Sequence, residues 1–163
     1  MGTTRASRHA HVKKTFKSVL RQYGFMPDNG EPRFNGVGPD VCFLLGGILT
    51  LVDVVVVNPL ADSYVDAEAR AAGTTLATAE SEKDRRHTPL VEARRMHFFP
   101  LALTTFGTVG PRSLVLLRRC ARHTTDPSGF MAHMCMALSV AVQTGNAKII
   151  MAATSRWWEY GVR

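Results

Sequence analysis

Two aspartates frame a stretch of the chain that has the pattern of a β-hairpin. Asp40 and Asp53 enclose apolar residues that are interrupted only by Gly46-Gly47 and Thr50. Two glycines between apolar runs are typical of a two-residue hairpin turn, because that turn needs positive φ angles, which glycine adopts without strain. With the turn at these glycines, Asp40 lies opposite Asp53, on the same face and with Cβ atoms roughly 4.5–5.5 Å apart.

The paired carboxylates predict a divalent-cation site. Asp53 is the only polar residue in the segment 51–57, and apolar side chains on both faces indicate a central strand that is covered on both sides. Two acids that repel each other in apolar surroundings are costly without a cation. Hard oxygen ligands at this spacing suit Mg²⁺ or Mn²⁺. The alternative is a hairpin whose open end carries two solvated aspartates.

A helix after the hairpin is expected to bring a lysine to this site. In the expected helix 75–87, Glu80, Lys83 and His87 share one face, which is unusually polar for a helix that packs on a sheet. This pattern is explained if Lys83 reaches Asp53. The alternative is an ion pair between Glu80 and Lys83 in water.

The remaining pattern predicts a mixed α/β fold in one domain, a central sheet flanked by helices with a helical last third. A helix over 7–23 carries an apolar stripe and a basic face, and Gly24 is a plausible stop. A strand is expected over 96–103. Further helices are expected over 61–72, 112–123, 128–144 and 147–160, the last two separated at Gly145.

Composition limits the partners and the compartment. The 163 residues carry 20 Lys and Arg against 13 Asp and Glu, a net charge of +7, which favours a polyanionic partner, nucleic acid before an anionic membrane. No segment is expected to cross a membrane. The three cysteines have no Cys-x-x-Cys spacing and indicate reduced, mostly buried thiols of an intracellular protein.

In its ordered motifs the chain resembles the PD-(D/E)XK, or restriction-endonuclease-like, nuclease superfamily. More narrowly, it is similar to the endonuclease domain at the C-terminus of reverse-transcriptase proteins of non-LTR retrotransposons. The matching segments, collinear over most of the chain, are Arg8-His9, Glu31-Pro32, Gly38-Pro39-Asp40, 52–60 through Ser63-Tyr64, Ala79-Glu80 through Lys83 to Arg86-His87, Phe98-Phe99-Pro100 to Phe106-Gly107, and Gly145-Asn146-Ala147.

The resemblance implies a restriction-endonuclease-like core and a metal-dependent endonuclease of low sequence specificity. It makes Asp40 and Asp53 the metal ligands and Lys83 a catalytic lysine that has moved to the helix, since Val55 stands at the usual lysine place. Glu31 matches an accompanying catalytic glutamate. The chain departs from the pattern at two places: Thr104-Thr105 stands where relatives tend to carry a glutamate, and His87 where an aromatic residue is usual.

These inferences predict DNA rather than RNA as the main partner, in the nucleus or the mitochondrion. The residues expected to contact the phosphate backbone are Arg8, His9, Lys13 and Lys17. The alternative function is a catalytically degenerate nuclease fold, kept as a basic nucleic-acid-binding or structural subunit of a larger protein or ribonucleoprotein assembly.

Overall fold

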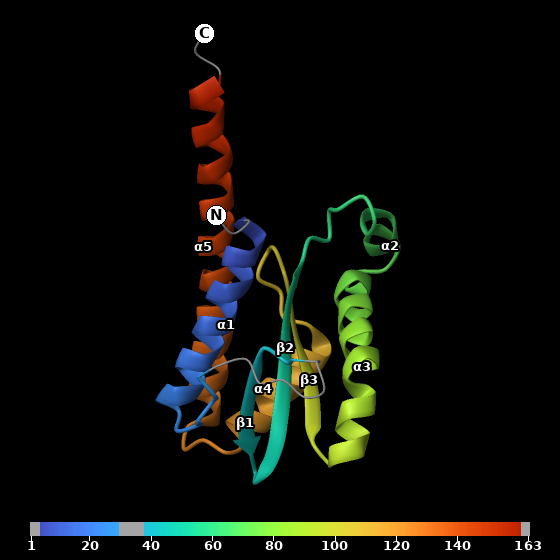
Figure 1. Cartoon of the computed structure of the whole chain (residues 1–163), viewed down its shortest axis with the longest axis vertical. Helices are drawn as coiled ribbons and strands as arrows, with labels where there is room; N and C mark the ends of the chain where they lie inside the picture. Colours follow the sequence, from blue (N-terminus) through green and yellow to red (C-terminus); the bar gives the residue numbers. More distant parts are fainter. Residues whose placement is uncertain (1–3, 30–37, 161–163) are drawn as a thin grey trace.

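The computed structural model of the chain describes residues 4–29 and 38–160, apart from the side chains of 4, 90, 93 and 156–160, and it has a mixed α/β fold (Figure 1). The elements in chain order are α1 (Thr4–Gln22), β1 (Val41–Leu45), β2 (Ile48–Val57), α2 (Val65–Arg70), α3 (Thr74–Arg94), β3 (His97–Thr104), α4 (Pro111–Ala121) and α5 (Pro127–Tyr160). The helices expected after the hairpin are present, and α3 continues through Pro89 beyond its expected end.

The glycine-tipped hairpin is confirmed. Strands β1 and β2 are antiparallel, and Leu45 faces Ile48 across the turn. Gly46 and Gly47 have φ angles of +58° and +81°, in the region that favours glycine. The register continues to Val41 opposite Val52 at the open end, which brings Asp40 next to Asp53.

The sheet has three strands in the order β1-β2-β3, so the apolar strand β2 is central, as its pattern predicts. Strand β3 runs parallel to β2, with Pro100 beside Asp53. Proline lacks the amide hydrogen of a strand ladder and is tolerated because β3 is an edge strand among the described residues. The parallel connection passes through α2 and α3.

Helices cover both faces of the sheet (Figure 1). On one face, Val52 and Val54 of β2 pack in a large core with buried residues of α1, α4 and α5. On the other, Val57 packs against Leu76 and Ala79 of α3. The alternation along β2 therefore turns Asp53 towards α3. All three cysteines are free, Cys42 and Cys120 buried and Cys135 half-buried.

The predicted break at Gly145 is wrong, because α5 is one continuous helix of 34 residues. A glycine inside a helix costs only about 1 kcal/mol relative to alanine, which packing readily offsets. Here the packing partner is Arg8 of α1, whose side chain lies where a Cβ atom at position 145 would stand. Gly145 therefore marks a close helix contact.

The segment Pro127–Ser155 of α5 is long and apolar enough to cross a membrane by length and composition, with a mean hydropathy of 1.2. Its first half has a packing explanation for that composition, since Phe130, Met134 and Leu138 are fully buried in the core. The second half extends past the rest of the fold (Figure 1). The absence of a membrane span stays a prediction.

Candidate active site

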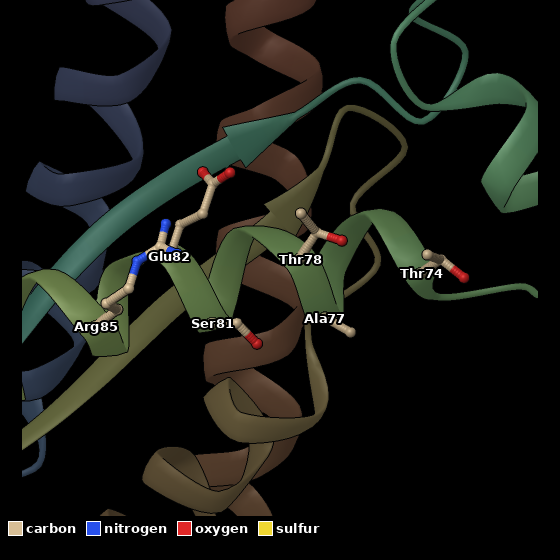
Figure 2. Close-up of a pocket in the computed structure, with 6 residues that line it drawn as sticks. All are labelled: Thr74, Ala77, Thr78, Ser81, Glu82 and Arg85. Atoms are coloured by element: carbon tan, nitrogen blue, oxygen red, sulfur yellow. The ribbon is translucent and has the colours of Figure 1, made fainter.

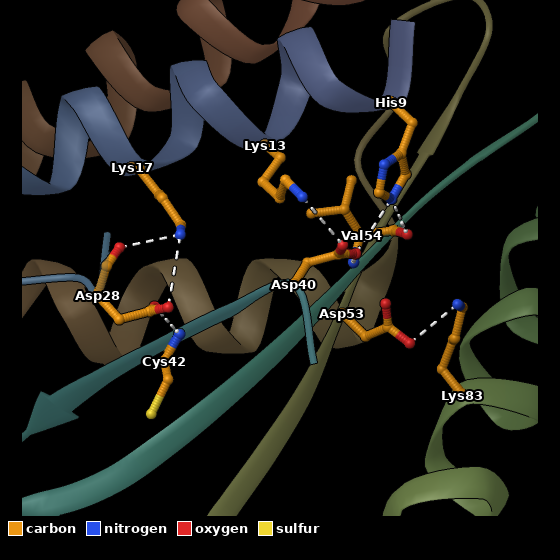
Figure 3. Close-up of polar contacts among 9 residues, drawn as sticks. All are labelled: His9, Lys13, Lys17, Asp28, Asp40, Cys42, Asp53, Val54 and Lys83. Carbon is orange, nitrogen blue, oxygen red and sulfur yellow. Dashed lines mark hydrogen bonds and ion pairs between the residues drawn. The ribbon is translucent and has the colours of Figure 1, made fainter. Parts of the chain in front are cut away.

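Asp40 and Asp53 lie together at the open end of the hairpin, as the register predicts (Figure 3). The two carboxyl groups are close enough for each to shift the pKa of the other. Asp53 is only 6% exposed. The N–H of Val54 donates to Asp40 Oδ2 at 2.8 Å, which fixes the Asp40 carboxylate against the backbone of β2. Two acids are thus held side by side with little access to water.

Helix α1 supplies the partners of Asp40. His9 and Lys13 lie one helical turn apart, so both reach the same carboxylate. His9 Nε2 is 3.0 Å from Asp40 Oδ2 and 3.0 Å from the carbonyl oxygen of Val54. Lys13 Nζ is 3.6 Å from Asp40 Oδ1. Because both neighbours of His9 Nε2 are acceptors, this nitrogen carries a proton and donates it.

Helix α3 supplies the partners of Asp53, again from adjacent turns. Lys83 Nζ donates to Asp53 Oδ2 at 2.9 Å, and His87 Nε2 is 3.0 Å from the same oxygen. His87 is fully buried and stacks on Phe98, with ring centroids 4.3 Å apart. Its Nδ1 is buried with no hydrogen-bond partner in the described structure. The tautomer that fits therefore has its proton on Nε2, donated to Asp53.

The pKa values of Asp40 and Asp53 are shifted in different directions. Burial raises the pKa of Asp53, and the hydrogen bond with Asp40 raises it further, against the opposing effect of Lys83. Burial also acts to raise the pKa of Asp40, but hydrogen bonds from His9 and Asp53 outweigh it and hold the pKa well below its ordinary value. The pKa values of these two neighbouring carboxyl groups are therefore shifted in opposite directions.

The predicted site residues fall into three groups. Asp40, Asp53 and Lys83 come together as expected. His9 and Lys13, expected to contact a phosphate backbone, both face Asp40, and their contact with a phosphate backbone stays a prediction. The prediction for Glu31 lies outside the described residues.

The other two predicted backbone contacts lie away from this cluster. Lys17 is 8% exposed, and its amine donates to the carbonyl oxygen of Asp28 at 2.9 Å. This pairing draws the amine towards the protein rather than towards solvent (Figure 3). Arg8 Nη1 donates to Asn146 Oδ1 at 2.8 Å, on α5.

Two polar residues singled out by the sequence have structural partners instead. Glu80 is 2% exposed and accepts hydrogen bonds from the N–H groups of Arg112 and Ser113 and from the Ser113 hydroxyl. It caps α4, and the alternative pairing of Glu80 with Lys83 is not observed. Thr104 Oγ1 accepts the N–H groups of Phe106 and Thr108, so it shapes the turn after β3.

The contacts of His9 and His87 with the acids were missed at the sequence level. Both had a usable signal, because each lies four residues from a lysine of the cluster: His9 before Lys13 and His87 after Lys83. A histidine–lysine pair on each of two helices that cover opposite faces of a sheet can contact acids at the end of the hairpin and in the central strand. This contact was not predicted because α1 and α3 are far apart in the sequence.

The carboxylate oxygens of Asp40 and Asp53 could supply part of the coordination shell of Mg²⁺. Mg²⁺ commonly takes one or two protein carboxylates and fills its remaining positions with water and phosphate oxygens. Within residues 4–29 and 38–160, no group of three or more His, Cys, Asp or Glu side chains is arranged to hold a metal ion. The pair therefore suits a cation that a substrate phosphate helps to bind, rather than a closed structural metal site.

A separate hollow of about 460 Å³ lies along α3 and is lined by Thr74, Ala77, Thr78, Ser81, Glu82 and Arg85 (Figure 2). None of these residues forms a hydrogen bond or ion pair with Asp40 or Asp53 in the described part of the chain. This hollow is not part of the candidate active site.

Comparison of the chain with protein-family models and with curated protein sequences found no match. What the site can do is therefore inferred from its own groups: a buried and a half-buried carboxyl group, two lysine amines and two imidazoles.

Proposed function

We propose that this protein hydrolyses phosphodiester bonds of nucleic acid, DNA before RNA, with the help of Mg²⁺ or Mn²⁺. The observation that carries the proposal is the pair of half-buried Asp40 and buried Asp53 with Lys83 Nζ 2.9 Å from Asp53. Paired acids beside a lysine amine combine cation ligands with a fixed positive charge. Phosphodiester hydrolysis needs both.

Each group has a distinct part in this chemistry. A bound Mg²⁺ supplies Lewis acidity and lowers the pKa of a coordinated water. Asp40 and Asp53 would hold the ion, and the Val54 N–H keeps Asp40 oriented. Lys83 places a positive charge at the edge of the pair, where it can stabilise the negative charge that develops on the phosphate and orient the attacking water.

The surroundings support a polyanionic substrate. The net charge of +7 favours binding to phosphates that does not depend on base sequence. An antiparallel hairpin followed by a parallel strand, with helices on both faces, is compatible with the restriction-endonuclease-like core that the motifs suggest. Descent from a retrotransposon endonuclease is part of the same proposal.

The test is nicking of a supercoiled plasmid by the purified protein with Mg²⁺, Mn²⁺ or EDTA. We expect cleavage with either metal and none with EDTA. Asp53→Asn should lower the rate by more than about 100-fold, because even hydrogen-bond partners of metal ligands are worth 10- to 100-fold. DNA binding should be kept or strengthened. Absence of metal-dependent cleavage of DNA and RNA of any form would contradict the proposal.

A second candidate function is a non-catalytic basic subunit of a nucleoprotein assembly. The observation that favours it is that both acids already have cationic partners in the protein, Lys13 on Asp40 and Lys83 on Asp53. In that case Mg²⁺ should leave the melting temperature unchanged, and Asp53→Asn should change nucleic-acid affinity little.

A further inference from the structure

A basic groove lies beyond the carboxyl ends of the parallel strands β2 and β3. It consists of two adjoining hollows of about 430 and 350 Å³ that share Arg8, Asn58, Thr105 and Ile149. We call it the arginine groove. Ligands of open parallel sheets commonly bind outside the carboxyl ends of the strands.

The positive charge of the arginine groove has no acidic counterpart in its lining. Arg5 and Arg8 both line it, and no Asp or Glu is among the described lining residues. Burial lowers the pKa of Arg8, and the nearby charge of Arg5 lowers it further. Two guanidinium groups that repel each other would be relieved by a bound anion.

The guanidinium of Arg8 is held in place by a hydrogen bond to α5. Its Nη1 donates to Asn146 Oδ1 at 2.8 Å, and Asn146 Nδ2 in turn donates to the Thr105 carbonyl oxygen at 2.7 Å. Its Nε is buried and has no hydrogen-bond partner within the described part of the chain. The contacts with Asn146 and, through it, with Thr105 fix the guanidinium at the groove.

The groove also offers an exposed aromatic ring. Phe106, at the turn after β3, lines it and is 59% exposed. Tyr64 lines its other part. Cations beside exposed aromatic side chains are the combination by which proteins bind unpaired nucleotides, with phosphate on the arginine and the base stacked on the ring.

The arginine groove is connected to the candidate active site through two elements. On α1, Arg5 and Arg8 lie within one turn of His9, which contacts Asp40. Along β2, the four residues from Asp53 to Val57 span about 13 Å at the usual strand rise. A strand of a few nucleotides can cover that distance.

We propose that the arginine groove binds an unpaired nucleotide of the strand that is cleaved, with its phosphate on Arg5 and Arg8 and its base stacked on Phe106. This inference rests on the proposed function, since it assigns the substrate form: nucleic acid that is single-stranded or frayed next to the cleavage position.

The test measures binding without cleavage. Fluorescence anisotropy in EDTA compares a labelled single strand with a blunt duplex, and inorganic phosphate and a nucleoside monophosphate serve as competitors. The single strand should bind more tightly than the duplex. Phe106→Ala should weaken single-strand binding by roughly tenfold, as expected for the loss of one stacked base. Phe106→Tyr should retain it, and Met26→Ala, at a side chain that is 86% exposed, is the control.

The arginines are tested through salt dependence. Arg5→Gln should weaken single-strand binding and lower the slope of log affinity against log salt by about one, and Arg86→Gln on α3 should do neither. Circular dichroism confirms that the variants are folded. Equal affinity for strand and duplex, no effect of Phe106→Ala, or competition by the mononucleotide as strong as by the strand would overturn the inference. Groove binding without metal-dependent cleavage would contradict the proposed function alone.

Discussion

Helix α3 contributes to two sites at which a carboxylate is buried, and the two sites compensate the cost of that burial with different partners. Glu80 is one acid surrounded by donors, two backbone N–H groups and a serine hydroxyl at the start of α4. Asp53 of β2 contacts Lys83 and His87, which lie one and two turns beyond Glu80 on the same face of α3, and it also lies beside another acid, Asp40.

The difference indicates which of the two buried acids is suited to catalysis or metal binding. Backbone donors at a helix N-terminus match a negative charge and cannot be exchanged without unfolding, so Glu80 is structural. The second site places like charges together and balances them with side chains that can move or titrate. Buried groups with perturbed pKa values cluster at functional sites. Burial alone does not separate the two, whereas the identity of the partners does.

The largest expected effect on the cleavage rate comes from replacing Lys83, the positively charged side chain beside Asp40 and Asp53. Lys83→Gln should lower the rate of metal-dependent cleavage by about 100- to 1000-fold, the size seen when one fixed donor to a developing charge is lost. Single-turnover kinetics with excess protein measure it. Arg86→Gln, an exposed cation on the same helix, is the matched control and should cleave at the wild-type rate. Equal losses in both variants would mean that only general charge matters.

Replacing Glu80, the acid of the other site, should lower stability without changing the rate of cleavage. Glu80→Gln should lower the free energy of unfolding by about 1–3 kcal/mol, because one amide oxygen cannot accept every donor that the carboxylate satisfies. Urea denaturation measures the change. The folded fraction should still cleave at the wild-type rate. Glu82→Gln, at an exposed position on α3, should stay within about 0.5 kcal/mol of wild type.

The smallest expected effect is a pH dependence from His9. Its pKa is raised above the ordinary value of 6.5, first by the hydrogen bond to Asp40. A raised pKa means that the folded state holds the proton more tightly. The stabilising contribution is therefore complete below 6.5 and is lost as pH rises through the folded-state pKa.

Urea titrations in EDTA at about pH 6 and pH 8 test this sign. The wild-type free energy of unfolding should fall over that interval by more than that of His9→Gln. His11→Gln on the same helix should behave as wild type, since His11 forms no ion pair with an acid in the described residues. Identical pH profiles for wild type and His9→Gln would show that the Asp40 contact contributes nothing to stability.

The hairpin and the acid pair were predictable from sequence because they depend on local rules. Two glycines set the turn, and strand register then places Asp40 beside Asp53. The lysine on α3 was predictable in the same way, from a polar helix face that had no reason to pack on a sheet. These features need only periodicity and turn chemistry.

Features that depend on packing between distant segments were not predictable. Gly145 has the pattern of a helix end, but Arg8 occupies the space beside it and the helix continues. The basic face of α1 has the pattern of a solvated surface, but Lys13 and Lys17 turn towards acids of the fold. The spacing of apolar and polar residues in the sequence does not indicate which other helix packs against a given residue.

Mn²⁺ titration by isothermal calorimetry tests the central claim most directly. Wild-type protein should bind the ion at one site, formed by the carboxylates of Asp40 and Asp53. Glu80→Gln should bind equally, whereas Asp53→Asn should bind far more weakly. No binding by the wild type, or equal binding by Asp53→Asn, would contradict the assignment of Asp40 and Asp53 as a cation site.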